Sequence, residues 1–251
     1  MMIANAFRLM LCVLMLLLPH AQAEPADMTF YTEHLPPYSY VQDDRVIGIN
    51  VELVEKLCQR LELSCSINLL PWRRAFSMAQ LNPNSGVFSA TLTEERAPLF
   101  QWVGPIASAE GYIFRLKGRT EINPSNLEEA KQFSVAIARG DMLEGYFKSH
   151  GFEYGDNMLD ISSRIEAAPL FLAKRIDLLV GSKRVIESWM LEHQELADMA
   201  EPLFILPDIG VHYLALNLSV PEELVHRLQK VLDEMREQGE IDALIQEYSQ
   251  G

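Results

Sequence analysis

The residue best suited to binding a small anion is Arg96, which ends the segment Ser89-Ala90-Thr91-Leu92-Thr93-Glu94-Glu95-Arg96. A guanidinium is always charged, and its planar fork of donors pairs with a carboxylate through two parallel hydrogen bonds. The hydroxyls of Ser89 and Thr91 lie just upstream and supply further donors. A solvated surface turn has the same composition, so the spacing leaves two interpretations open, and the surrounding elements decide between them.

The start of the chain predicts export. Arg8 is the single charge before an apolar stretch from Leu9 to Leu18, and Ala21-Gln22-Ala23 supplies the small residues that a signal peptidase recognises. This pattern predicts a signal peptide over residues 1–23, cleavage near Ala23 and a mature protein in the periplasm. Loss of Arg8 changes the net charge from −14 to −15. Such an acidic chain excludes nucleic acid as a partner, because nucleic acid requires a basic footprint.

Cys58 and Cys65 are the two cysteines of the predicted mature chain, and an oxidising compartment favours pairing them. Apolar residues at helical spacing place Cys58 near a helix end, and Cys65 opens the strand-like run 65–70. We therefore predict a disulfide that joins a helix to the next strand. Two buried free thiols, or a metal pair lacking its other ligands, are the alternatives.

Strands and helices alternate along the chain, which predicts an α/β fold with mostly parallel sheets. Without the predicted signal peptide, 251 − 23 = 228 residues remain, enough for one large or two modest domains. The first half is predicted to contain strands at 29–32, 65–70, 86–89 and 112–114 and helices at 50–62 and 72–79. The second half is predicted to contain strands at 133–138, 176–180, 204–205 and 213–216 and helices at 142–148, 163–174, 185–191, 221–238 and 241–248.

Several motifs, in order, resemble the family 3 bacterial solute-binding proteins, the periplasmic receptors of amino-acid ABC importers. The motifs are Thr32-Glu33, Pro37-Tyr38, the element from Gly48 to Leu57, the spacing of Cys58 and Cys65, the Ser89–Arg96 segment, Arg175-Ile176-Asp177, Gly239 and Tyr248. The pair Pro71-Trp72-Arg73-Arg74-Ala75 and Trp102-Val103-Gly104-Pro105 is similar to a divergent branch of this family, whose members often lack a dedicated importer.

The resemblance implies a two-lobed periplasmic-binding-protein fold of type II, in which each lobe is a mostly parallel sheet flanked by helices. Lobe one is expected at roughly 24–114 plus 214–251 and lobe two at 115–213, with the ligand in a cleft that closes by a hinge motion. The expected partner is a small carboxylate-bearing, amino-acid-like molecule, passed to an ABC permease or reported to a membrane sensor. We expect a monomer without cofactor or metal.

The resemblance also assigns roles within the cleft. Arg96 becomes the clamp on the ligand carboxylate, with Ser89 and Thr91 as supporting contacts. Gly140 precedes a helix whose first backbone amides, in lobe two, favour an anion.

Two aromatic residues are candidates for the wall of the cleft. Trp72 stands where members of the family place a residue against the ligand side chain, and Tyr38 is a similar case. Either ring is equally consistent with a place in the core.

The chain departs from the family pattern at two positions. Ser182 stands where the family usually has the aspartate that binds the ligand ammonium, and a serine cannot neutralise that charge. Either another acid pairs with the amine, or the ligand has no α-ammonium group. Asp141 stands where threonine or serine is usual, and it is either the cap of the following helix or, together with Glu33, the replacement partner of the ammonium.

Four arginines, Arg73, Arg74, Arg96 and Arg139, fall near the expected cleft segments. If two or more of them face the cleft, they indicate extra negative charge on the ligand. If they face solvent, they say little about the ligand. Such a cleft also suits the alternative function, an exported dehydratase of the same fold acting on a cyclic carboxylic acid. The histidines are scattered singly, and neither a nucleophile elbow nor a phosphate loop occurs, so we expect a binding protein and not an enzyme.

Overall fold

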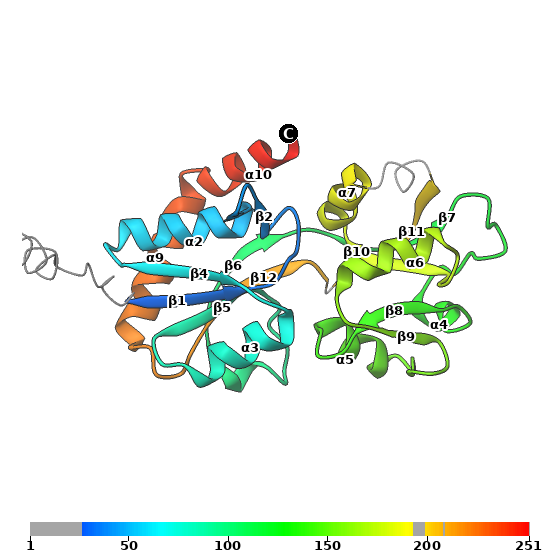
Figure 1. The fold of residues 1–251 in the computed structure, drawn as a ribbon, viewed down its shortest axis with the longest axis horizontal. Coiled ribbons are helices and arrows are strands. Elements are labelled where there is room, and N and C mark those ends of the chain that lie inside the picture. Colours follow the sequence, from blue (N-terminus) through cyan, green and yellow to red (C-terminus); the bar gives the residue numbers. More distant parts are fainter. Residues whose placement is uncertain (1–26, 193–198, 208, 251) are drawn as a thin grey trace, which may run out of the picture.

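Two five-stranded sheets form the centres of two lobes that lie side by side (Figure 1). The computed structural model describes residues 27–192, 199–207 and 209–250. The predicted signal peptide and its cleavage site lie outside these residues. Within the described part of the chain, every helix is too short or too polar to cross a membrane.

The sheet of lobe one has the strand order β4-β1-β5-β12-β6. β4, β1 and β5 are parallel, whereas β12 runs antiparallel to both of its neighbours. Side chains alternate between the two faces, so Phe30 and Phe88 pack under α2 and α9, while Tyr31 and Val87 pack under α3. The elements are β1 (Met28–Thr32), β2 (Tyr40–Gln42), β3 (Arg45–Ile47), α2 (Ile49–Arg60), β4 (Cys65–Leu69), α3 (Trp72–Leu81), β5 (Ser85–Ala90), η1 (Ala97–Leu99), β6 (Gln101–Ser108), β12 (Val211–Leu216), α9 (Glu222–Glu237) and α10 (Glu240–Gln250).

The sheet of lobe two has the strand order β11-β7-β10-β8-β9. β10, β8 and β9 are parallel, and β7 runs antiparallel to β10 and β11. α6 and α7 cover one face, and α5 covers the other. The elements are β7 (Gly111–Leu116), α4 (Leu127–Ala130), β8 (Val135–Ala138), α5 (Met142–Ser149), β9 (Met158–Ile161), η2 (Arg164–Glu166), α6 (Ala167–Leu172), β10 (Leu178–Ser182), α7 (Lys183–Glu192) and β11 (Ala200–Leu206).

The chain passes between the lobes twice, from β6 to β7 and from β11 to β12. The crossings touch where the Ala109 amide donates to the Gly210 carbonyl at 3.0 Å. Gly210 has φ +99°, and a Cβ there would lie 2.2 Å from the Ala109 oxygen, so this approach requires glycine. The predicted lobe boundaries, 114/115 and 213/214, fall inside β7 and β12. All of β7 belongs to the sheet of lobe two, and all of β12 belongs to the sheet of lobe one. The boundaries differ from the prediction because a strand joins a sheet through its pairing partners, which its own sequence does not specify.

The predicted fold class is confirmed, and each predicted helix and strand has a counterpart in the structure. The segment 163–174 divides into η2 and α6, and the prediction omits the β2–β3 hairpin, β6 and β9. The predicted disulfide joins Cys58 near the end of α2 to Cys65 at the start of β4, with an S–S distance of 2.09 Å.

Candidate functional site

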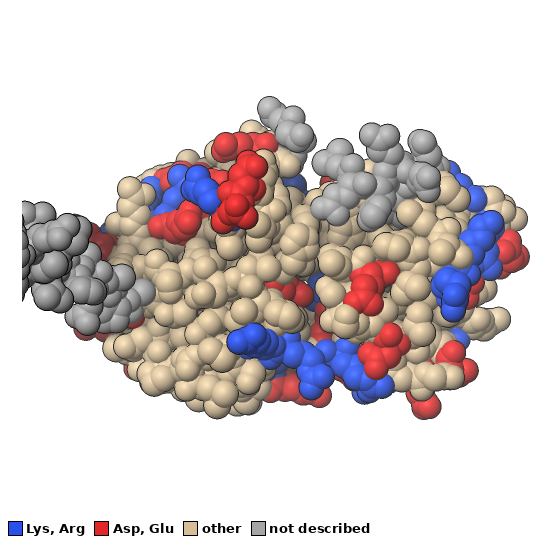
Figure 2. All heavy atoms as spheres, in the orientation of Figure 1, with Lys and Arg blue, Asp and Glu red and all other residues tan. Residues whose placement is uncertain are grey.

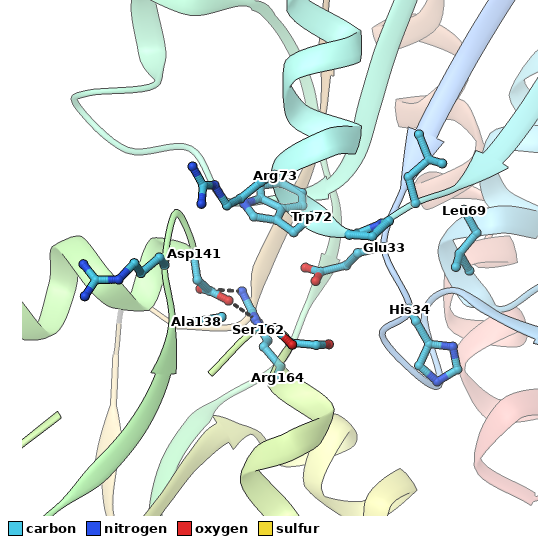
Figure 3. A pocket seen from close by; sticks show the side chains of 13 residues that line it. Glu33, His34, Leu69, Trp72, Arg73, Ala138, Asp141, Ser162 and Arg164 are labelled. Atoms are coloured by element: carbon cyan, nitrogen blue, oxygen red, sulfur yellow. Dashed lines mark hydrogen bonds and ion pairs between the residues drawn. The ribbon is translucent and has the colours of Figure 1, made fainter. Parts of the chain in front are cut away.

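A cavity of about 370 Å³ lies between the lobes and is named here the cleft cavity (Figure 3). It lies beyond the carboxyl ends of β1, β4, β8 and β9, the usual ligand position of open α/β sheets, and its size suits a small molecule. Lobe one contributes Glu33, His34, Leu69, Leu70, Pro71, Trp72 and Arg73, and lobe two contributes Ala138, Arg139, Asp141, Ser162, Ser163 and Arg164.

A second, more open cavity of about 960 Å³, named the outer cavity, adjoins the first. The loop from Thr91 to Arg96 lines one side, and residues of α5 line the other. Asp141 lines both cavities, so the two meet at the start of α5. Arg96 is thus in the wall of the outer cavity, whereas Trp72 is in the wall of the cleft cavity.

Arg96 is a buried cation between two aromatic rings. Only 9% of the residue is exposed, and its guanidinium carbon lies 5.2 Å from the ring centres of both Trp72 and Phe76. Its Nη2 donates to the Gly140 carbonyl at 3.0 Å, and its Nη1 donates to the Thr91 carbonyl at 3.4 Å. Among the described residues no carboxylate forms an ion pair with it, and burial lowers the pKa of Arg96. The site therefore holds a desolvated positive charge whose direct contacts are two carbonyl oxygens and two aromatic rings, with no carboxylate hydrogen-bonded to it among the described residues.

The Gly140 carbonyl links the two lobes. It accepts a hydrogen bond from Trp72 Nε1 at 2.9 Å as well as the one from Arg96, and both donors belong to lobe one. Gly140 has φ +78°, and a Cβ there would lie 3.1 Å from Arg73 Cγ, so glycine suits this close approach between lobes. This interlobe bridge lies where the two cavities adjoin, because Trp72 lines the cleft cavity and Arg96 and Gly140 line the outer cavity.

Asp141 has its carboxylate occupied within lobe two. One oxygen accepts from the Leu143 amide at 2.9 Å and caps α5. The guanidinium of Arg164 bonds both oxygens, at 2.8 Å from Nη2 to Oδ1 and through Nε to Oδ2. With 2% of its side chain exposed, Asp141 is a buried, paired cap and has little capacity left for a ligand.

Glu33 is the second acid of the cleft cavity, and its carboxylate has no hydrogen-bond or ion-pair partner among the described residues. The residue is 5% exposed, and its carboxylate points into the space between Trp72 and Arg164 (Figure 3). Burial raises the pKa of Glu33 to about 7; Arg164 lowers it, Asp141 raises it and Arg96 lowers it. A buried, unpaired carboxyl group therefore faces the cavity.

Three predicted site residues lie outside the walls of both cavities. Ser89 has φ +60°, and its hydroxyl accepts from Asn50 Nδ2 at 2.9 Å. Tyr38 is fully buried with its ring 4.4 Å from that of His212. Ser182 ends β10 and is buried beside the crossing segments, 3.2 Å from where a Cβ on Gly210 would stand. The structure brings Trp72, Thr91, Arg96, Gly140 and Asp141 together, but not these three.

The other arginines predicted near the cleft differ in whether they line a cavity. Arg73 and Arg139 line the cleft cavity, whereas Arg74 lines neither cavity. Arg139 pairs with Asp160 at 2.5 Å and is half exposed. Figure 2 shows Lys and Arg side chains across the junction of the lobes, on the side of α3 and α5. Sequence reasoning missed Arg164, which opens η2 two serines after the end of β9; its place behind that strand is the available signal, and β9 itself is not predicted.

Comparison with known proteins gives one consistent result. Residues 29–251 match the model of the bacterial extracellular solute-binding proteins, family 3. The arginine-binding extracellular protein ArtP of Bacillus subtilis (strain 168) is 21% identical over 218 residues, which cover 86% of this chain and 82% of that protein.

Solved structures show the same fold. An ancestral arginine-binding protein bound to arginine has a TM-score of 0.75 at 18% identity, covering 88% of this chain and 97% of the other. A histidine kinase sensor domain with similarity to periplasmic binding proteins has a TM-score of 0.77 at 19% identity, covering 88% and 95%. The architecture is therefore that of type II periplasmic binding proteins.

Proposed function

The chain belongs to the bacterial extracellular solute-binding proteins of family 3, and on that premise we propose that it captures a small carboxylate-bearing, amino-acid-like ligand between its lobes. Arg96 binds the ligand carboxylate. The observation that carries this proposal is the burial of Arg96 without an ion-pair partner among the described residues. A carboxylate is a stronger acceptor for a guanidinium than the carbonyls that it now contacts, so an anionic ligand competes well for its donors.

Glu33 binds the ligand ammonium in this proposal. The aspartate that the family places near Ser182 is missing, and Asp141 is occupied by Arg164 and by the start of α5. Glu33 is then the acid of the cleft cavity that still lacks a cation. Two buried, unpaired charges of opposite sign at the lobe junction complement a zwitterion.

Ligand entry requires the lobes to separate. Rotation about the paired crossings at Ala109 and Gly210 would break the hydrogen bonds from Trp72 and Arg96 to Gly140. Loss of this bridge joins the two cavities into one cleft and frees the guanidinium. Closure then re-forms the Trp72–Gly140 hydrogen bond over the bound ligand, while the guanidinium of Arg96 stays on the ligand carboxylate.

In its ligand-bound form, the protein either delivers the ligand to an ABC permease or signals ligand binding to a membrane sensor. The similar proteins include the substrate binding protein of an amino acid ABC transporter and a histidine kinase sensor domain, which support these two outputs as candidates. Either output depends on the same binding event, so binding is the step to test first.

The test is a thermal-shift screen of the purified protein against L-amino acids and small mono- and dicarboxylates. At least one compound should raise the melting temperature, because a ligand that binds only the native state stabilises it. Arg96→Ala should weaken binding of that compound at least about a hundredfold, since each hydrogen bond to a charged group contributes roughly 1.5–3 kcal/mol.

The matched control is Arg227→Ala, which removes an exposed arginine from α9 and should leave the affinity unchanged. A screen without any shift would refute the proposed function. An unchanged affinity of the Arg96 variant would refute the role of this residue.

A further inference from the structure

The cleft cavity has a charged end and an end that we name apolar because Leu69, Leu70 and Pro71 line it, with the imidazole of His34 as its polar side chain. Figure 3 shows Asp141 and Arg73 on one side of the cavity and His34 and Leu69 on the other. Leu70 and Pro71 continue the wall beyond Leu69. In the proposed function the ligand carboxylate reaches Arg96, which lines the outer cavity next to the charged end, and the ammonium reaches Glu33, so the side chain extends toward the apolar end.

Both acids that line the cavity already have a cationic partner, either in the structure or in the proposed function. Glu33 and Asp141 are the two carboxylates that line it among the described residues. Arg164 bonds both oxygens of Asp141, and in the proposed function Glu33 receives the ligand ammonium. A second cationic group on the ligand would find no carboxylate at the apolar end.

The arginines of the wall offer no compensation for a second positive charge. Arg164 is paired with Asp141 and Arg139 with Asp160, and Arg73 has no ion-pair partner among the described residues. A desolvated ammonium or guanidinium beside Leu69 would therefore be unpaired.

We propose that the cleft cavity selects amino-acid-like ligands with an uncharged side chain, apolar where it meets Leu69 and Leu70, and excludes cationic side chains. This inference rests on the proposed function, because it takes Glu33 as the ammonium partner. Selection of uncharged side chains distinguishes this chain from the similar proteins, several of which are arginine-binding by name.

The test compares L-norleucine with L-lysine, two amino acids that differ in the terminal group of an otherwise equal side chain. Isothermal titration calorimetry on the full mature protein should show norleucine binding at least about a hundredfold more tightly than lysine, because an unpaired buried charge is strongly disfavoured. L-arginine should behave like lysine.

Leu69→Asp supplies the missing acid at the apolar end and should shift the preference toward lysine by at least about tenfold. The matched control is Asn68→Asp, which adds the same charge at the exposed neighbouring position of β4 and should retain the wild-type preference. Circular dichroism and the melting temperature establish that each variant is folded. The comparison of norleucine with lysine on the wild-type protein does not depend on these variants.

Lysine, arginine or glutamate binding more tightly than norleucine would overturn the inference and leave the proposed function intact. The same holds if norleucine shows no binding while another amino acid does. Absence of binding by every compound tested would overturn the proposed function, and this inference with it.

Discussion

Replacing Glu33 with glutamine is expected to stabilise the ligand-free protein above neutral pH. The carboxyl group is buried and has no partner among the described residues, so its ionised form is poorly solvated. Glutamine keeps the size and polarity of the side chain and removes the charge. The expected gain in stability accompanies a loss of ligand affinity, because the proposed binding of an ammonium requires the carboxylate.

The size of the effect follows from proton linkage. Burial raises the pKa of Glu33 from 4.5 to about 7, so between these values the native state holds a proton that the unfolded state has lost. The free energy of unfolding of the wild type therefore falls as pH rises through this window. At about 1.36 kcal/mol per pH unit, the window corresponds to a loss of up to about 3 kcal/mol. Opening of the lobes hydrates the carboxylate, which makes this figure an upper limit.

The assay is urea unfolding at pH 4.5 and pH 8 for the wild type and for Glu33→Gln. The two proteins should be similarly stable at the lower pH, and the variant should be more stable at the higher pH. Glu237→Gln, an exposed substitution on α9, is the control for a general effect of charge. An equal difference between wild type and Glu33→Gln at both pH values would refute the reasoning.

Two further predictions concern stability. Replacing both Cys58 and Cys65 with serine removes a crosslink across a sequence separation of 7 residues and should lower the free energy of unfolding by about 2.5 kcal/mol in non-reducing urea; an unchanged value would contradict this expectation. Arg164→Met leaves the buried carboxylate of Asp141 unpaired and should cost about 3–5 kcal/mol. Asp141→Asn should restore most of that stability, since asparagine also caps helices, and equal costs of Arg164→Met in both backgrounds of this double-mutant cycle would count against a buried ion pair.

The elements that the sequence predicted are those with a clear local period. β6 was missed because Gly104-Pro105 is typical of a turn, yet the strand continues through it by pairing with β12, with a register shift on the partner. β9 was missed because its four residues show no alternation: its outer two are buried and its inner two are exposed. Tertiary pairing produces both strands, and no local pattern signals it.

The candidate site was predictable to a similar degree. A charged residue in a recognisable motif, such as Arg96, is visible in sequence, and so is the cap of a helix at Asp141. Arg164 was not visible, because its partner Asp141 lies 23 residues away on another element. Ser182 was placed in the site by counting from a family pattern, whereas the structure buries it at the crossing segments.

The sequence by itself determined the α/β architecture and the family, favoured the Cys58–Cys65 crosslink over its alternatives, and offered the cap of α5 as one of two roles for Asp141. Each of these depends on neighbours within a few residues or on the order of motifs along the chain. Only the tertiary structure decided which charges are left unpaired. The donors of the interlobe bridge, Trp72 and Arg96, are 68 and 44 residues from Gly140, and the isolation of Glu33 results from burial between lobes. Burial and long-range electrostatics are properties of the assembled cleft, so residue order alone does not specify them.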